Sequence, residues 1–218
     1  MTAGPSAGGT VSELSPEVSV FLNIPYDRRF SKLALAYIAG ITSFGLRPRA
    51  TLEIPGSERR LDRITDLIRA CQYSIHDLSR VQLNREYPPT PRFNMPFELG
   101  MAVAIAKSDR NSPQGNWFVF ETMQRRVQKS LSDLDGTEIY VHGGTVRGIF
   151  GQLANAFVRS AKQPTVGRMQ EVFEELQNYL PGIKREAGSP DLFAPSVFTR
   201  LVVFARTIAD PQIPQRSK

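Results

Sequence analysis

Short apolar runs alternate with amphipathic stretches along most of the chain, and this alternation constrains the fold more than any other feature. Runs typical of buried strands lie at residues 18–24, 46–54, 73–77, 117–121 and 137–141. Apolar residues at helical spacing fill residues 30–44, 58–70, 94–107, 145–161, 169–179 and 195–209. Because strands that alternate with helices form a parallel sheet covered on both faces, we predict an α/β fold. Its flavodoxin-like parallel sheet would have five strands in the order 2-1-3-4-5.

The 218 residues fit one domain with an extension. Residues 1–16 are rich in Gly, Ser, Ala and Thr, which predicts a disordered tail, and they lack the basic and apolar regions of a signal peptide. We assign residues 17–161 to the α/β domain and residues 162–218 to a helical C-terminal extension packed on it.

Composition argues against several classes of protein. The single cysteine, Cys71, permits no intrachain disulfide, and the formal net charge of +6 comes from scattered basic residues that are not interleaved with aromatics. Nucleic acid is therefore not the expected partner. The apolar runs are far shorter than the ~20 residues that cross a bilayer, so we expect a cytoplasmic protein with no membrane partner. Two histidines and one cysteine lie far apart, and we expect neither a metal site nor a resident cofactor.

One carboxylate stands out within the apolar residues 95–106. Glu98 is the only charged residue of this segment, one turn into a helix that is apolar on all sides. Burying an unpaired carboxylate costs several kcal/mol, so Glu98 either pairs with an arginine such as Arg92 or faces a cavity. Ligands of parallel sheets bind outside the carboxyl ends of the strands, where this helix would begin. We interpret Glu98 as the centre of a functional site.

Three segments in the predicted order resemble the nucleoside 2-deoxyribosyltransferases and the related TIR-like nucleotide-binding proteins. They are SIHDLS at residues 74–79, FNMPFELGMAVAIA at 93–106 and SLSDLDG at 130–136. The resemblance covers about residues 18–160 and implies N-glycosidic chemistry at C1′ of a ribose or deoxyribose. It implies that Glu98 acts at C1′ and that Asp77 holds the sugar or protonates the base. The early Gly-Pro segment of the transferases is replaced here by NIPYD.

Other residues near the predicted strand ends have both a binding and a structural interpretation. Tyr26 could stack on a base or pack on the sheet edge, and Asp27 could bind a ribose hydroxyl or cap the first helix. Arg28 could hold a phosphate or be solvated. His76 should point to the face opposite Asp77 and be structural.

The same two interpretations apply further along the chain. Asn94 could contact the substrate or serve as an N-cap. Ser132 and Asp133 could hold the sugar or simply build a turn. His142 could reach the pocket, although a structural position is favoured.

Three functions stay open from the sequence. The first is an enzyme that cleaves or transfers the N-glycosidic bond of NAD, a nucleotide or a nucleoside. It would resemble an NAD glycohydrolase or a deoxyribosyltransferase and act in bacterial defence or signalling. Such an enzyme could work as a homo-oligomer. The second is a non-catalytic nucleotide-binding sensor of the same fold. The third is an interaction protein in which helices 145–209 form the partner surface.

Overall fold

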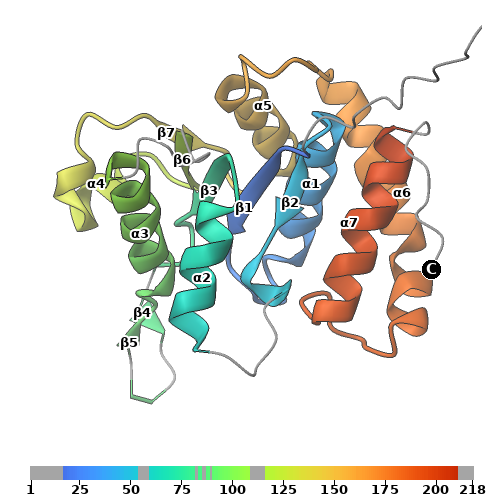
Figure 1. The fold of residues 1–218 in the computed structure, drawn as a ribbon, viewed down its shortest axis with the longest axis horizontal. Helices are drawn as coiled ribbons and strands as arrows, with labels where there is room; N and C mark the ends of the chain where they lie inside the picture. The colour runs from blue at the N-terminus through green and yellow to red at the C-terminus, as the bar shows by residue number, and fades with distance from the viewer. Residues whose placement is uncertain are drawn as a thin grey trace, which may run out of the picture.

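A parallel sheet of five strands runs through the middle of the molecule (Figure 1). The computed structural model describes residues 17–53, 59–81, 83–84, 87–88, 90–108 and 116–210, so the predicted tail of residues 1–16 lies outside the described residues. The sheet contains β1 (Ser19–Asn23), β2 (Arg47–Arg49), β3 (Tyr73–Asp77), β6 (Asn116–Glu121) and β7 (Ile139–Val141). Its order, β2-β1-β3-β6-β7, is 2-1-3-4-5 when only these strands are counted, which confirms the predicted flavodoxin-like fold.

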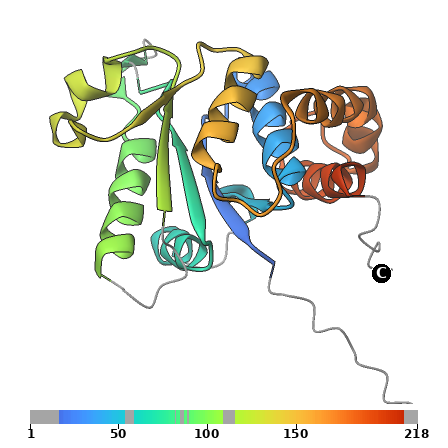
Figure 2. The same cartoon turned by 90° about the horizontal axis from the view of Figure 1, so that it is seen from above.

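Helices cover both faces of this sheet (Figure 2). The helices are α1 (Ser31–Ser43), α2 (Arg60–Arg69), α3 (Asn94–Ser108), α4 (Arg126–Ser130), α5 (Val146–Ala156), α6 (Val166–Glu186) and α7 (Pro195–Ala209). Helices α1 and α5 pack together on one face, and α2 and α3 lie on the other. Helices α6 and α7 form a further layer outside α1, at the right of Figure 2. Among the described helices, none combines the length and apolar character that crossing a bilayer requires.

The central strands are buried on both sides, and successive residues contribute to different cores. On β1, Val20 and Leu22 belong to the cluster that contains α1, whereas Phe21 belongs to the cluster formed with α2 and α3. This is the two-residue period of a strand. Consecutive side chains at a strand end are therefore delivered to opposite faces of the sheet.

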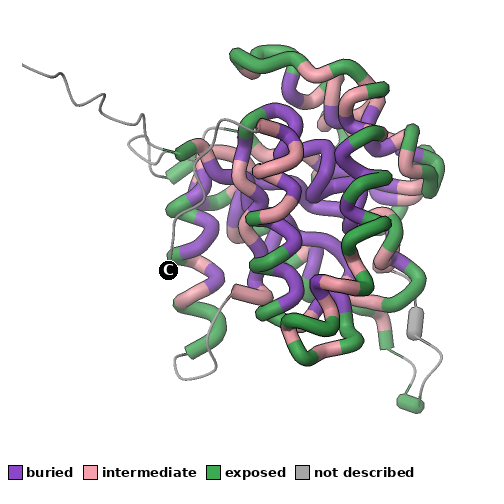
Figure 3. The backbone as a smooth tube through the Cα atoms, turned by 90° about the vertical axis from the view of Figure 1, so that its right-hand side faces the viewer, coloured by how far each residue is buried: buried purple, intermediate pink, exposed green. Residues whose placement is uncertain are grey.

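Helix α1 is apolar all round because protein surrounds it. Ten successive residues, 34–43, are buried between the sheet on one side and α6 and α7 on the other. Figure 3 shows buried residues concentrated in the interior and exposed residues on the outer helix surfaces. A helix enclosed in this way can carry a polar side chain inward only if that side chain meets a partner.

Strand β2 is shorter than predicted. The prediction ran over residues 46–54, but the strand spans Arg47–Arg49, and Thr51–Glu53 then forms a 3₁₀ turn, η1. The Glu53 carboxylate accepts a hydrogen bond from Arg49 Nε. This side-chain contact folds the chain back, which the apolar pattern alone does not reveal.

Helix α6 is longer than predicted. The prediction placed it at residues 169–179 and closed it at Pro181, but the helix spans Val166–Glu186 and passes through that proline. Pro181 is exposed, and Ile183 beyond it is buried in the same cluster as the rest of the helix. Packing of the later turn outweighs the hydrogen bond that proline removes.

Smaller differences occur elsewhere. Helix α5 ends at Ala156 instead of continuing to residue 161, and α4 was not predicted. The predicted loop 79–93 contains a short antiparallel pair, β4 (Leu83–Asn84) and β5 (Thr90–Pro91).

Candidate functional site

Glu98 lies on the inner side of α3, at the point where the strand order reverses. The buried residues of α3 are Met95, Glu98, Leu99, Ala102 and Ile105, and Glu98 is 8% exposed. The Met95 carbonyl accepts a hydrogen bond from Asn23 Nδ2 (2.9 Å), so this turn of α3 meets the end of β1. Since β2 and β3 flank β1, the carboxyl end of β1 is the topological switch point, where parallel sheets bind ligands.

The Glu98 carboxylate has no partner among the described residues. No hydrogen bond or ion pair joins it to another described side chain, and the predicted alternative partner, Arg92, pairs with Asp27 instead. Burial raises the pKa of Glu98 from 4.5 to about 7, and the positive charge of Arg60 at the start of α2 opposes that rise. Glu98 therefore changes protonation near neutral pH, as a general acid or base must.

Tyr26 lies close enough to Glu98 to be affected by its charge. Its hydroxyl lies 3.1 Å from Thr51 Oγ1, and its ring packs against Phe193 at a centroid distance of 5.4 Å. Burial and the charge of Glu98 raise the pKa of Tyr26. The ring is thus engaged in packing at the sheet edge, which is the structural one of its two predicted roles.

Beneath α3, buried polar side chains are linked by hydrogen bonds. Asn23 Nδ2 lies 2.9 Å from His76 Nδ1, and His76 Nε2 lies 3.0 Å from Ser74 Oγ. Burial lowers the pKa of His76 to about 3, so the ring is neutral, accepts from Asn23 and donates to Ser74. His76 is a structural residue on the face of the sheet that Glu98 shares.

Asp27 organises the loop after β1. Its Oδ1 accepts the backbone N–H of Phe30 (3.2 Å) before α1. Its Oδ2 lies 3.2 Å from Arg80 Nε and 3.7 Å from Arg92 Nη1. Arg28 beside it is exposed. Asp27 therefore joins the loop after β1 to the segments that follow β3 and precede α3.

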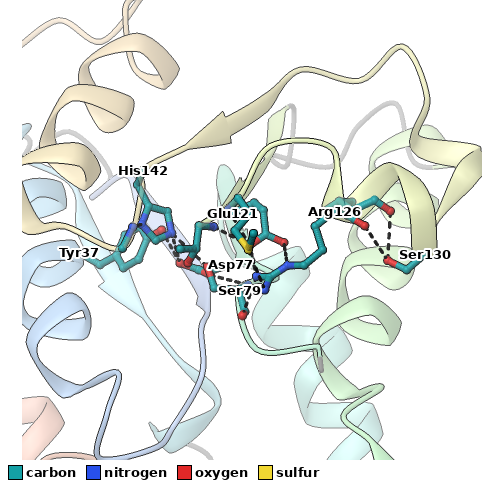
Figure 4. A network of polar contacts seen from close by, with 11 residues as sticks. Tyr37, Asp77, Ser79, Glu121, Arg126, Ser130 and His142 are labelled. Carbon is teal, nitrogen blue, oxygen red and sulfur yellow. Dashed lines mark hydrogen bonds and ion pairs between the residues drawn. The ribbon is translucent and has the colours of Figure 1, made fainter. Parts of the chain in front are cut away.

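Asp77 is fully buried and its carboxylate is saturated (Figure 4). Oδ2 accepts the hydroxyl of Tyr37 (2.8 Å) and lies 3.2 Å from His142 Nε2, and Oδ1 accepts the backbone N–H of Ser79 (2.9 Å). His142 Nδ1 accepts the Gly144 N–H (3.1 Å), so Nε2 carries the ring proton of the neutral form. Burial and the Asp77 charge keep the pKa of Tyr37 well above its usual range, which keeps that donor protonated.

This network is not a catalytic triad. Ser79 Oγ lies 3.1 Å from His142 Nε2, the same nitrogen that meets Asp77, whereas a triad uses opposite ring nitrogens. Tyr37 belongs to α1, so Asp77 points to the α1 face of the sheet and Glu98 lies under α3 on the other. The structure does not bring Asp77 and Glu98 together.

A second buried carboxylate, Glu121, ends β6 in the same region (Figure 4). Arg126 forms two contacts with it, one of them from Nε to Oε2 at 3.0 Å, and Arg126 Nη2 donates to the Ser79 carbonyl (2.8 Å). Glu121 thus fixes α4 to the ends of β3 and β6. It is as fully partnered as Asp77.

The other predicted residues lie away from these contacts. Asn94 is exposed and is the first residue of α3, so Phe93 occupies the cap position instead. Ser132 and Asp133 are exposed in the 3₁₀ turn η2 (Ser132–Leu134). Within the described part of the chain, no hydrogen bond or ion pair joins these three side chains to Glu98.

Sequence reasoning missed three residues in these contacts: Asn23 contacts the first turn of α3, Arg60 acts on the charge of Glu98, and Arg80 pairs with Asp27. Asn23 carried a signal, since a polar side chain at the end of an apolar strand needs a buried partner. Arg60 and Arg80 carried none, because their positions depend on how α2 and the end of β3 pack.

No protein-family model, curated protein or solved structure matches the chain. Across the described residues, no three His, Cys, Asp or Glu side chains are grouped as metal ligands would be. The chemistry of the site therefore has to be argued from its own residues.

Proposed function

We propose that this protein breaks or transfers the N-glycosidic bond of NAD, a nucleotide or a nucleoside, and that Glu98 acts at C1′ of the sugar. The observation that carries the proposal is a buried carboxylate without a described partner at the switch point of a parallel sheet. A folded protein retains such a group at a cost in stability, and sites with perturbed pKa values in crevices are typical of function.

The chemistry suits a carboxylate in this position. As the C1′–N bond breaks, its electron pair leaves with the base and positive charge develops at C1′. The ionised Glu98 stabilises that charge or forms a C1′–O bond with it. Water or an acceptor base then takes the sugar and releases the carboxylate. The proton that water loses ends on the departing purine or, when the neutral nicotinamide leaves, in solvent.

A nucleotide-binding sensor is the second candidate, and one observation favours it. Asp77, the expected partner in catalysis, is committed to Tyr37 and His142 on the other face of the sheet. A site with Glu98 but no second acid or base would bind a ribose hydroxyl without cleaving the bond to the base.

A base-release assay separates these functions. The protein is incubated with NAD, with 2′-deoxyadenosine and with its 5′-monophosphate, and the released base is measured by chromatography. Glu98→Gln should lower the rate at least about 100-fold, whereas Glu175→Gln, on the exposed surface of α6, should not change it. Base release that survives Glu98→Gln unchanged would falsify the role of Glu98.

The same assay has a predicted pH dependence. Because the pKa of Glu98 is raised to about 7 and the ionised form acts at C1′, kcat/KM should rise with pH up to about 7 and level off above it. Binding without base release at any pH favours the sensor, and neither binding nor release favours an interaction protein.

A further inference from the structure

Two arginines from different parts of the chain meet on one carboxylate beside the proposed site. Arg80 follows β3, Arg92 precedes α3, and both lie within ion-pair distance of Asp27 Oδ2. The Asp27 side chain is 17% exposed, while those of Arg80 and Arg92 are 34% and 45% exposed. The carboxylate is thus covered and the guanidinium groups reach solvent.

The charges of this cluster do not cancel. One carboxylate faces two guanidinium groups, and the backbone N–H groups of Arg29 and Phe30 already occupy its other oxygen. Each guanidinium carries five N–H donors, of which Arg80 directs Nε and Arg92 directs Nη1 at Asp27. The exposed Arg28 and Arg29 add to the positive charge.

The cluster and Glu98 belong to neighbouring segments of the chain. Arg92 stands two residues before the first residue of α3, the helix that carries Glu98 in its second turn. Asp27 directly follows Tyr26, whose hydroxyl is within electrostatic reach of Glu98. The arginine cluster and the Glu98 carboxylate thus both belong to the carboxyl edge of the sheet, next to β1.

We infer that Arg80 and Arg92, oriented by Asp27, form a subsite for a phosphoryl group of the molecule bound at Glu98. The inference rests on the proposed function and narrows its substrate class to phosphorylated nucleosides. Guanidinium groups bind phosphate through paired N–H···O contacts, and the positive end of the 15-residue α3 favours the same charge. Asp27 is a positioning residue, because it holds the arginines and leaves the ligand to them.

Calorimetric titration of the full chain tests this inference. The probes are 2′-deoxyadenosine 5′-monophosphate, 2′-deoxyadenosine and inorganic pyrophosphate. The monophosphate should bind at least tenfold more tightly than the nucleoside. Arg80→Gln and Arg92→Gln should each weaken monophosphate and pyrophosphate binding about tenfold, the loss of one charge-assisted contact, and leave nucleoside binding unchanged. Arg159→Gln, at an exposed arginine after α5, is the matched control and should change nothing.

Equal wild-type affinity for monophosphate and nucleoside overturns the inference, as does monophosphate binding that neither arginine variant weakens. If the nucleoside still releases its base, the proposed function is supported although the phosphoryl subsite is overturned. Conversely, arginine-dependent phosphate binding without base release supports the subsite and overturns the enzyme. Glu98→Gln separates the two further, because it should lower the rate of base release at least about 100-fold and keep pyrophosphate affinity. Absence of binding by all three probes overturns the subsite, and the base-release assay with NAD then decides the proposed function.

Discussion

Two carboxylates near the carboxyl edge of the sheet are both buried, but they differ in the hydrogen-bond donors that surround them. Asp77, on the α1 face, is fully buried and receives hydrogen bonds from a tyrosine hydroxyl, an imidazole and a backbone N–H. Glu98, under α3, is 8% exposed and has no such donor among the described residues. Burial alone therefore does not decide whether a carboxylate has hydrogen-bond donors around it.

The difference lies in what each carboxylate does for folding. A buried group with all its hydrogen bonds formed stabilises the structure around it, because its removal leaves its partners buried without hydrogen bonds. A buried group without partners costs stability and is retained where binding or catalysis uses it. Substitutions at the two positions should consequently shift stability in opposite directions.

The largest effect is expected at Asp77. In Asp77→Asn an amide N–H₂ replaces one oxygen and faces hydrogen-bond donors, either the Ser79 N–H or those of Tyr37 and His142. If the amide faces the Ser79 N–H, that contact loses about 2 kcal/mol, and the two remaining hydrogen bonds, now to a neutral oxygen, lose about 1 kcal/mol each. The unfolding free energy, measured by urea denaturation, should therefore fall by about 4 kcal/mol. Asp66→Asn, at an exposed position of α2, should stay within about 0.5 kcal/mol of the wild type. Equal urea midpoints for both variants would show that the network does not hold the fold.

The opposite sign is expected at Glu98. Its pKa rises from 4.5 to about 7 on folding, so the folded state binds the proton more tightly and stability falls as pH rises between these values. Gln carries no such proton. Relative to the wild type, Glu98→Gln should therefore gain roughly 2 to 3 kcal/mol between pH 5 and pH 8.

Urea denaturation at the two pH values measures this gain. Glu175→Gln serves as the control, because its side chain is exposed on α6. A stability difference between Glu98→Gln and wild type that stays constant over this pH range would place Glu98 among the partnered carboxylates.

A smaller effect should follow from Tyr37→Phe. This change removes one donor to Asp77 and leaves the contacts from His142 and Ser79. The expected loss is about 1.5 kcal/mol, one hydrogen bond to a charged group. Tyr179→Phe, at an exposed position, is the reference and should be neutral. A loss as large as that of Asp77→Asn would mean that the tyrosine alone carries the network.

The same contrast explains which parts of the molecule were predictable from sequence. Strand order followed from the alternation of elements, and the burial of Glu98 followed from its apolar neighbours. The partners of Asp77 did not follow, because Tyr37 and His142 are 40 and 65 residues away and meet it only through tertiary packing. The resemblance assigned Asp77 to the site by position, but the pleat of β3 turns it to the other face.

Short elements that depend on side-chain contacts were likewise not predictable from the sequence. Helix α4 depends on the contact between Arg126 and Glu121, and the end of β2 depends on the contact between Glu53 and Arg49. Local patterns of hydrophobicity do not encode such contacts. Helix α6 continued past Pro181 because the turn beyond it is buried, which tertiary packing decides.

Titration of the Glu98 side chain tests the central claim most directly. Carbon-13 NMR of the glutamate carboxyl groups, with Glu98 assigned by the signal lost in Glu98→Gln, gives its pKa in the intact protein. The structure predicts a pKa of about 7, caused by burial of the carboxyl group. A pKa near the ordinary 4.5 would show that Glu98 is solvated or paired, and would contradict its place at the centre of the site.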